Sequence, residues 1–367
     1  RRSSDLKEGT TQEDVDAGNA KKQWKFDAAI DSLVSIAFDA EEEGTGTLAV
    51  NSDNEGIETS LHLTINGGTI TINSNDDALN ANEDGVSVIT INGGVLTCNA
   101  GGGQEGDGID SNGWIVINDG FIVSAASATS QDSGVDSDNG IYINGGTVLA
   151  SGNMYDEVSE DSEQAFVALN FASSVEAGQM FALKNADGEI VTAFSAANDF
   201  QTLVYSSSEL TDGDYTLYEI SSADGVAVSG LYTEVTSVSD EVQLQGSKGA
   251  GGFGGMGGAP NGEPNGERPE MPDGEAPSMP EGEMPSMSDG EAPEKPDGEA
   301  SSGQEGEAPS KPEGEAPEGQ NGERPERPED SSEEASSVFT ISGISNNFSH
   351  ISELTTEAYE EESSTNV

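Results

Sequence analysis

The stretches LTINGGTI (63–70), ITINGGVL (89–96), IVINDGFI (115–122) and IYINGGTV (141–148) repeat one pattern, with the turn Asn at 66, 92, 118 and 144. The interval is 26 residues each time (92 − 66, 118 − 92, 144 − 118). Before the Asn, aliphatic residues that would face inward alternate with residues that would face outward. The same alternation resumes after the turn. Period-two alternation on both sides of a fixed turn predicts two short strands per repeat.

A third short strand precedes each of these pairs. GIE (56–58), ALN (78–80), GID (108–110) and GVD (134–136) each centre on an aliphatic residue, and TLAVNSDNEGI (47–57) adds a half-repeat upstream. A fixed order of three strands per repeat predicts an all-β parallel β-helix of about five coils, stacked at roughly 4.8 Å per coil.

Several residues have a structural role in such a helix. The four turn Asn residues would form an internal ladder, in which each amide bonds the turn backbone of its neighbour. Gly68, Gly94, Gly120 and Gly146 suit a turn position that needs a positive φ. Cys98 shares its register with Ile72, Ser124 and Ala150, so we expect it in the core.

The remaining chain divides by composition. We expect a disordered tether at 1–21, the β-helix at 22–164 and an antiparallel closing segment at 165–245, with turns at ADGE (186–189) and TDGD (211–214). A disordered, acidic Pro/Gly/Glu-rich insert follows at 246–337. Residues 338–350 could return as a strand on VQLQG (242–246), before a disordered tail at 351–367. WKFDAAIDSLVSIAF (24–38) fits either a helix or a strand.

The charge balance restricts the partners. With 70 acidic and 13 basic residues the formal net charge is −57. This excludes binding of nucleic acid or anionic membranes through basic patches. It permits binding of cations, of neutral polymers, or of anionic polymers through bridging metals. Adaptation to a salty habitat is an alternative reading of the charge.

The acids align from coil to coil, and no Lys or Arg lies between Lys25 and Lys184. Like charges about 5 Å apart repel by about 3 kcal/mol at an effective dielectric of 20. Oxygen-only ligands in flexible geometry favour Ca²⁺; the alternative is a solvated acidic edge. The candidate ligands are Glu55, Glu58, Asp76, Asp77, Asn80, Asp107, Asp110, Asp132 and Asp136.

TINGGTITINSNDDALNANE, EGDGIDSNGWIVINDG and SGVDSDNGIYINGGTVLASGN resemble the secreted carbohydrate-binding β-helix proteins of anaerobic Gram-positive bacteria. The resemblance covers about residues 22–245. It implies a right-handed, pectate-lyase-like parallel β-helix with bound calcium that binds cellulose or polygalacturonate. The chain departs from the family in having fewer coils than many members and a long acidic insert.

Aromatic side chains on outward registers are candidates for sugar contact. These are Trp114, Phe121 and Tyr142, with His62 in the register of Trp114. Packing beneath the N- or C-terminal segments is the alternative for each.

A lyase of this fold usually uses Arg or Lys as its base, and residues 26–183 contain neither. The lack of a basic residue also weakens the reading as a β-helix hydrolase, although Asp76 and Asp77 with Asp107 or Asp110 could pair as acid and base.

Three hypotheses remain open: a non-catalytic carbohydrate-binding protein with structural calcium, a polysaccharide lyase or hydrolase, and a calcium-binding adhesive protein without a glycan ligand. We expect a monomer at the cell surface or outside the cell, anchored through a segment upstream of Arg1. No apolar run in the chain is long enough to span a membrane.

Overall fold

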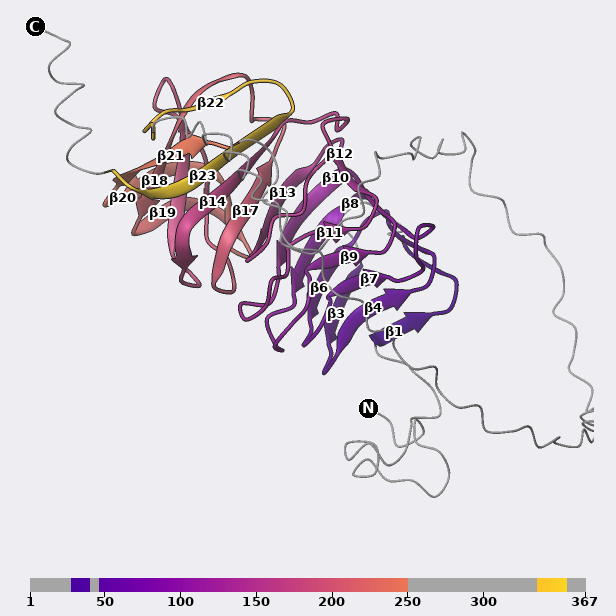
Figure 1. The fold of residues 1–367 in the computed structure, drawn as a ribbon. Coiled ribbons are helices and arrows are strands. Elements are labelled where there is room, and N and C mark those ends of the chain that lie inside the picture. The colour runs from indigo at the N-terminus through magenta and orange to yellow at the C-terminus, as the bar shows by residue number, and fades with distance from the viewer. Residues whose placement is uncertain (1–27, 40–45, 250–334, 355–367) are drawn as a thin grey trace, which may run out of the picture. The chain divides into compact units, whose positions relative to one another are not determined.

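The computed structural model describes residues 28–39, 46–249 and 335–354. This part of the chain is all-β (Figure 1). The expected parallel coils and the antiparallel closing segment are confirmed. The predictions for 1–21, for most of the acidic insert (250–334) and for most of the tail (355–367) lie outside the described residues.

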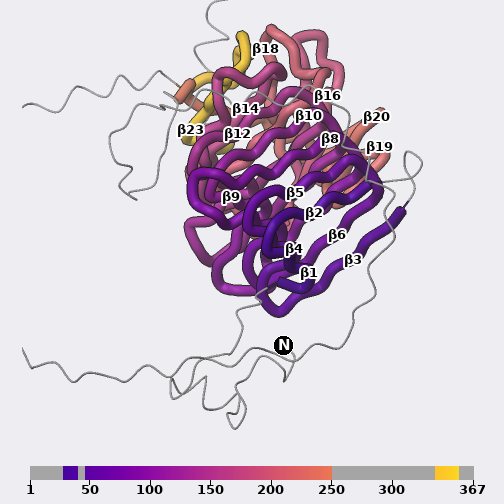
Figure 2. The backbone as a smooth tube through the Cα atoms, turned by 90° about the vertical axis from the view of Figure 1, so that its right-hand side faces the viewer, coloured from indigo at the N-terminus to yellow at the C-terminus, as the bar shows by residue number. Residues whose placement is uncertain are grey.

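Three parallel sheets run along the solenoid and contribute one strand each to a coil (Figure 2). We name them by what lies on them. The acidic sheet contains β1 (Ala28–Ser32), β4 (Glu55–Thr59), β7 (Leu79–Ala81), β9 (Ile109–Ser111) and β11 (Asp136–Ser137). The aromatic sheet contains β2 (Ser35–Phe38), β5 (His62–Ile65), the first halves of β8 (Val88–Asn99) and β10 (Trp114–Ala125), and β12 (Gly140–Ile143). The capped sheet contains β3 (Thr47–Asn51), β6 (Thr69–Asn73), the second halves of β8 and β10, and β13 (Thr147–Gly152).

The repeat sets the register of the stacked strands. Ile115 pairs with Ile89 on one side and with Ile141 on the other, and all three side chains are fully buried. On the acidic sheet Ile57, Leu79 and Ile109 stack in the same way. Cys98 pairs with Ile72 and Ser124 and is 1% exposed, as its register predicts.

An Asn ladder forms at the turn, although its partners differ from the prediction. The Nδ2 of Asn92 donates to Oδ1 of Asn66 at 2.8 Å, and Asn118 donates to Asn92 at 2.8 Å. Asn144 donates to Asn118 at 2.9 Å. The amides therefore bond one another rather than the turn backbone, because an amide donates and accepts and its equivalent lies in the next coil.

The turn glycines allow coils to approach closely. Gly94 has a φ of +89°, and a Cβ placed there would lie 2.7 Å from the carbonyl oxygen of Gly68 in the preceding coil. Gly146 has the same relation to Gly120, at 2.6 Å. Glycine is needed here both for its backbone conformation and for the space above the neighbouring coil.

An antiparallel closing segment covers the last coil. Its strands are β14 (Phe166–Val175), β15 (Met180–Asn185), β16 (Ile190–Phe194), β17 (Phe200–Ser206), β18 (Gly213–Ile220), β19 (Ser222–Val228), β20 (Leu231–Ser239), β21 (Val242–Lys248), β22 (Phe339–Ile341) and β23 (Ser345–Glu353). β17 pairs with β13, so the edge of the capped sheet is hydrogen-bonded. Val123 and Leu149 pack into the apolar cluster of this segment, with Phe200 and Tyr205.

The residues near both ends of the described part form strands. β23 pairs antiparallel with β21, and β22 pairs with β18, so residues 339–353 belong to the closing segment. The segment left open between helix and strand contains β1 and β2 over its described part. Among the residues described, there is no helix that could cross a membrane.

We predict that Gly94→Ala lowers the free energy of unfolding by more than about 3 kcal/mol, because it adds a backbone clash to a left-handed conformation. Gly188 has a φ of +79° but nothing within 4 Å of its Cβ position, so Gly188→Ala should lose about 1 kcal/mol. Urea denaturation of both variants tests the stacking. Equal losses would contradict the close approach of coils.

Candidate functional site

Polar side chains line the outside of the acidic sheet in hydrogen-bonded register. Asp31 pairs with Glu58, Glu58 with Asn80, Asn80 with Asp110, and Asp110 with Asp136. We call these five residues the outer acidic row. Each lies on its own strand, so the spacing between neighbours is the strand spacing of about 4.8 Å.

A second row lies three residues before Glu58, Asn80 and Asp110 and consists of Glu55, Asp77 and Asp107. We call it the inner acidic row. Asp77 Oδ1 accepts the backbone N–H of Asp107 at 2.7 Å. Asp107 Oδ1 accepts the N–H of Ser133 at 2.6 Å. One oxygen of each Asp is thus fixed by the backbone of the next coil, which orients the second oxygen.

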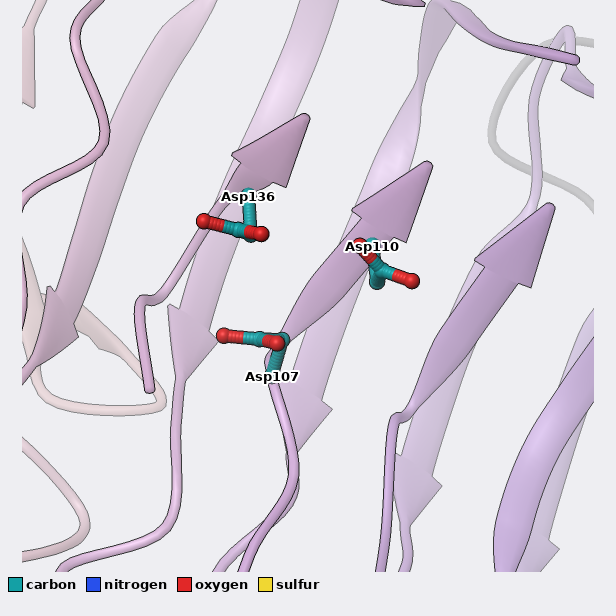
Figure 3. A group of neighbouring side chains, drawn as sticks. All are labelled: Asp107, Asp110 and Asp136. Atoms are coloured by element: carbon teal, nitrogen blue, oxygen red, sulfur yellow. The ribbon is translucent and has the colours of Figure 1, made fainter. Parts of the chain in front are cut away.

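Three carboxylates from the two rows converge. Ligand oxygens of Asp107, Asp110 and Asp136 all lie within 4.8 Å of one another (Figure 3). Oxygens that bind one Ca²⁺ at 2.3–2.6 Å can be at most about 5.2 Å apart. The separations therefore fit a single Ca²⁺.

Asn80 supplies an independent indication of a ligand. Its side chain is 7% exposed, and its Nδ2 donates to Asp77 Oδ2 at 3.1 Å. The other atom of this amide is Oδ1, and it is buried without a hydrogen-bond partner in the described structure. A buried acceptor without a donor costs about 1–3 kcal/mol. A neutral oxygen next to Asp110 in register is a suitable further ligand for a hard cation.

Burial raises the pKa of the clustered acids. The pKa of Asp107 rises to about 9 and that of Asp110 to about 8, first through desolvation and then through neighbouring carboxylates. The pKa of Asp77 rises to about 7 from the same leading cause, and that of Asp136 is also raised. Burial therefore favours the protonated form of these groups, and repulsion between neighbouring carboxylates adds to that preference.

The other candidate ligands have different surroundings. Asp132 accepts the N–H of Gly106 at 2.6 Å and the hydroxyl of Ser130, so it holds a loop. Glu58 is 9% exposed and accepts from Asn82. Glu55, whose pKa rises to about 9 through burial and then through Glu58, has a buried oxygen without a partner. Asp76 is not part of the cluster of Asp107, Asp110 and Asp136.

Two acids of this surface were not among the predicted ligands. Asp156 accepts the N–H of Ser137 at 2.9 Å, and its pKa rises to about 7 through burial and then through Asp136. Asp156 follows the last full coil, where the sequence no longer has the 26-residue repeat. Asp31 belongs to the first coil, where the repeat is equally weak in the sequence. The available signal was the dipeptide Ile30–Asp31, an aliphatic residue followed by an acid, as in Ile109–Asp110.

The aromatic sheet brings three of the four predicted sugar-contact residues onto one face. His62, Val88, Trp114 and Gly140 form one outward row, in that order. Tyr142 pairs with Val116 and is therefore the diagonal neighbour of Trp114. His62 is exposed, and the two aromatic rings are half-buried.

Phe121 lies elsewhere. It pairs with Val95 and Thr147 on the capped sheet and packs against the apolar cluster of the closing segment. This is the alternative that the sequence left open for it, packing beneath the C-terminal segment.

A family model described as carbohydrate-binding domain-containing protein matches residues 4–225. The chain belongs to this family. The match spans the solenoid and much of the closing segment, so a carbohydrate is the expected partner of the folded part. No curated protein and no solved structure gives a match.

We predict that the metal-free protein, kept in EGTA, loses stability as the pH rises from 7 to 9. The unfolded chain has already released the protons of its carboxyl groups below this window, whereas folded Asp107 and Asp110, with pKa values of about 9 and 8, release theirs only within it. The folded state binds more protons, so the free energy of unfolding falls with pH.

Thermal melts across this window measure the effect. Asp110→Asn should reduce the slope, because Asn does not ionise, while Asp187→Asn, an exposed residue of the closing segment, should leave it unchanged. A slope that is the same in all three proteins would contradict the assignment.

Proposed function

We propose that the chain is a non-catalytic, extracellular carbohydrate-binding protein that takes plant cell-wall-type polysaccharide, cellulose or polygalacturonate, on a calcium-stabilised β-helix. The family match carries the carbohydrate part of this proposal. The finer parts rest on the two outward surfaces of the solenoid.

Calcium is proposed for the cluster of Asp107, Asp110 and Asp136. The support is the oxygen-only donor set, the 4.8 Å limit on its separations and the unpartnered Oδ1 of neighbouring Asn80. When bound, the ion would supply the positive charge that no side chain between Lys25 and Lys184 provides. It would stabilise the stacked coils and leave positions open to oxygens from outside.

Each surface suits a different type of glycan. A flat face with Trp114 beside Tyr142 and exposed His62 suits the pyranose rings of an extended neutral chain. A uronate is repelled by the net charge, but its carboxylate can share a cation held by the acidic sheet. Cellulose would therefore bind without the metal, and pectate only with it.

The absence of catalysis is proposed from the sequence. Proton abstraction beside a uronate needs a base, and in this fold it is usually Arg or Lys, which residues 26–183 lack. Release of unsaturated or reducing sugars from pectin or xylan would overturn this part of the proposal.

For the aromatic face, we predict that Trp114→Ala weakens retention on cellulose roughly tenfold, since a buried aromatic anchor contributes more than 1 kcal/mol. Phe121→Ala is the matched control: it should lower the melting temperature through lost packing but keep wild-type retention. The reverse pattern would place the glycan on the capped sheet.

For the acidic sheet, we predict that Ca²⁺ raises the melting temperature of the wild type at pH 7.5 and permits retention on pectate, and that EGTA removes both effects. Asp110→Asn should abolish the shift in melting temperature, and Asp187→Asn should keep it. No shift in the wild type would refute the calcium site.

A further inference from the structure

A cleft of about 320 Å³ opens where the last coil meets the closing segment. Its walls come from Asn153 and Met154 after β13, Asn170–Ala172 of β14, Gln201 of β17 and His350 of β23. This volume is at the lower end of the range for small-molecule sites, about 300–1,000 Å³. None of the described residues that line it belongs to a strand of the acidic or aromatic sheet.

Two irregularities in the strands form the cleft. In β23, Phe348 pairs with Leu169 and Ile351 with Phe171, so Ser349 and His350 together oppose Asn170. His350 is exposed and has a φ of +56°, a conformation that a non-glycine residue rarely adopts.

The second irregularity is in β14. Asn170 pairs with Thr202 and Val175 with Phe200, so residues 171–174 arch away opposite Gln201 alone. Bulges of this kind commonly re-aim side chains at binding sites.

The lining is uncharged in a chain with 70 acidic residues. Among the described residues, no Asp, Glu, Lys or Arg lines the cleft, and the polar groups are amides, hydroxyls and one imidazole. Amide and hydroxyl groups both donate and accept, as the hydroxyls of a neutral sugar do. A uronate would meet no Lys or Arg among the described residues that line the cleft.

Hydrogen-bonding capacity remains open toward the cleft. Within 28–39, 46–249 and 335–354, the side chain of Asn170 has no hydrogen-bond partner. Gln201 donates Nε2 to the carbonyl of Phe171 at 3.1 Å, which leaves Oε1 to accept. His350 contacts Ser349 Oγ through Nδ1 at 3.2 Å, which leaves Nε2.

From these observations we propose that the cleft binds the end or a short branch of a neutral oligosaccharide through Asn170, Gln201 and His350. The inference rests on the proposed function, since it assigns one recognition site to the same glycan-binding protein. The bulge in β23 positions the imidazole, and the arch in β14 provides the room.

Titration of the full chain with cellotetraose tests this, with calorimetry as the readout. Asn170→Leu removes the amide at similar size, and His350→Gly removes the ring while glycine accepts the positive φ without strain. Each should raise the Kd roughly three- to tenfold. Glu234→Gly is the matched control, because Glu234 has a φ of +52° outside the cleft. It should leave the Kd unchanged.

The outcomes separate the inference from the proposed function. Suppose that the wild type is retained on polysaccharide. If it does not bind cellotetraose, or if both cleft variants keep the wild-type Kd, the cleft assignment is overturned and the proposed function stands. If the variants weaken tetragalacturonate instead, the neutral class is wrong. If the wild type is retained on neither cellulose nor pectate, the proposed function fails and the cleft assignment fails with it.

Discussion

In-register stacking of parallel coils is the constraint on which this structure depends, because it places each residue directly against its equivalent in the next coil. For aliphatic residues this is favourable, and Ile89, Ile115 and Ile141 make a continuous core. For Asn it is favourable too, because one amide can donate to the next, as Asn92 does to Asn66. For carboxylates it is unfavourable, since none of them can donate when ionised. Burial first, and then the neighbouring carboxylates, raise the pKa values of Asp107 and Asp110.

The sequence was sufficient to predict those parts of the fold that repeat. The 26-residue spacing predicted the strands, the core registers and the turn glycines, because each signal occurs several times. The Asn ladder was predicted, but with the wrong partners, since the period does not say which way an amide points. Asp31 and Asp156 were not predicted because they lie in the first coil and beyond the last, where the pattern has no second copy.

The candidate cluster was predictable only in outline. Nine residues were proposed as ligands, and three of them converge: Asp110 and Asp136 pair in register, and the backbone N–H of Ser133 holds one oxygen of Asp107. Such orientation depends on loop conformation, which composition does not reveal. The cleft at Asn170 and His350 had no sequence signal, since it arises from bulges that join strands about 180 residues apart (350 − 170).

Calorimetric titration of the metal-free protein with Ca²⁺ near pH 7, in buffers of different ionisation enthalpy, tests most directly whether the stacked carboxylates require a cation. Because Asp107 and Asp110 hold protons there in the absence of metal, binding must displace them. The account predicts saturable binding with release of protons for each ion bound. Absence of saturable binding, or binding without proton release, would contradict it.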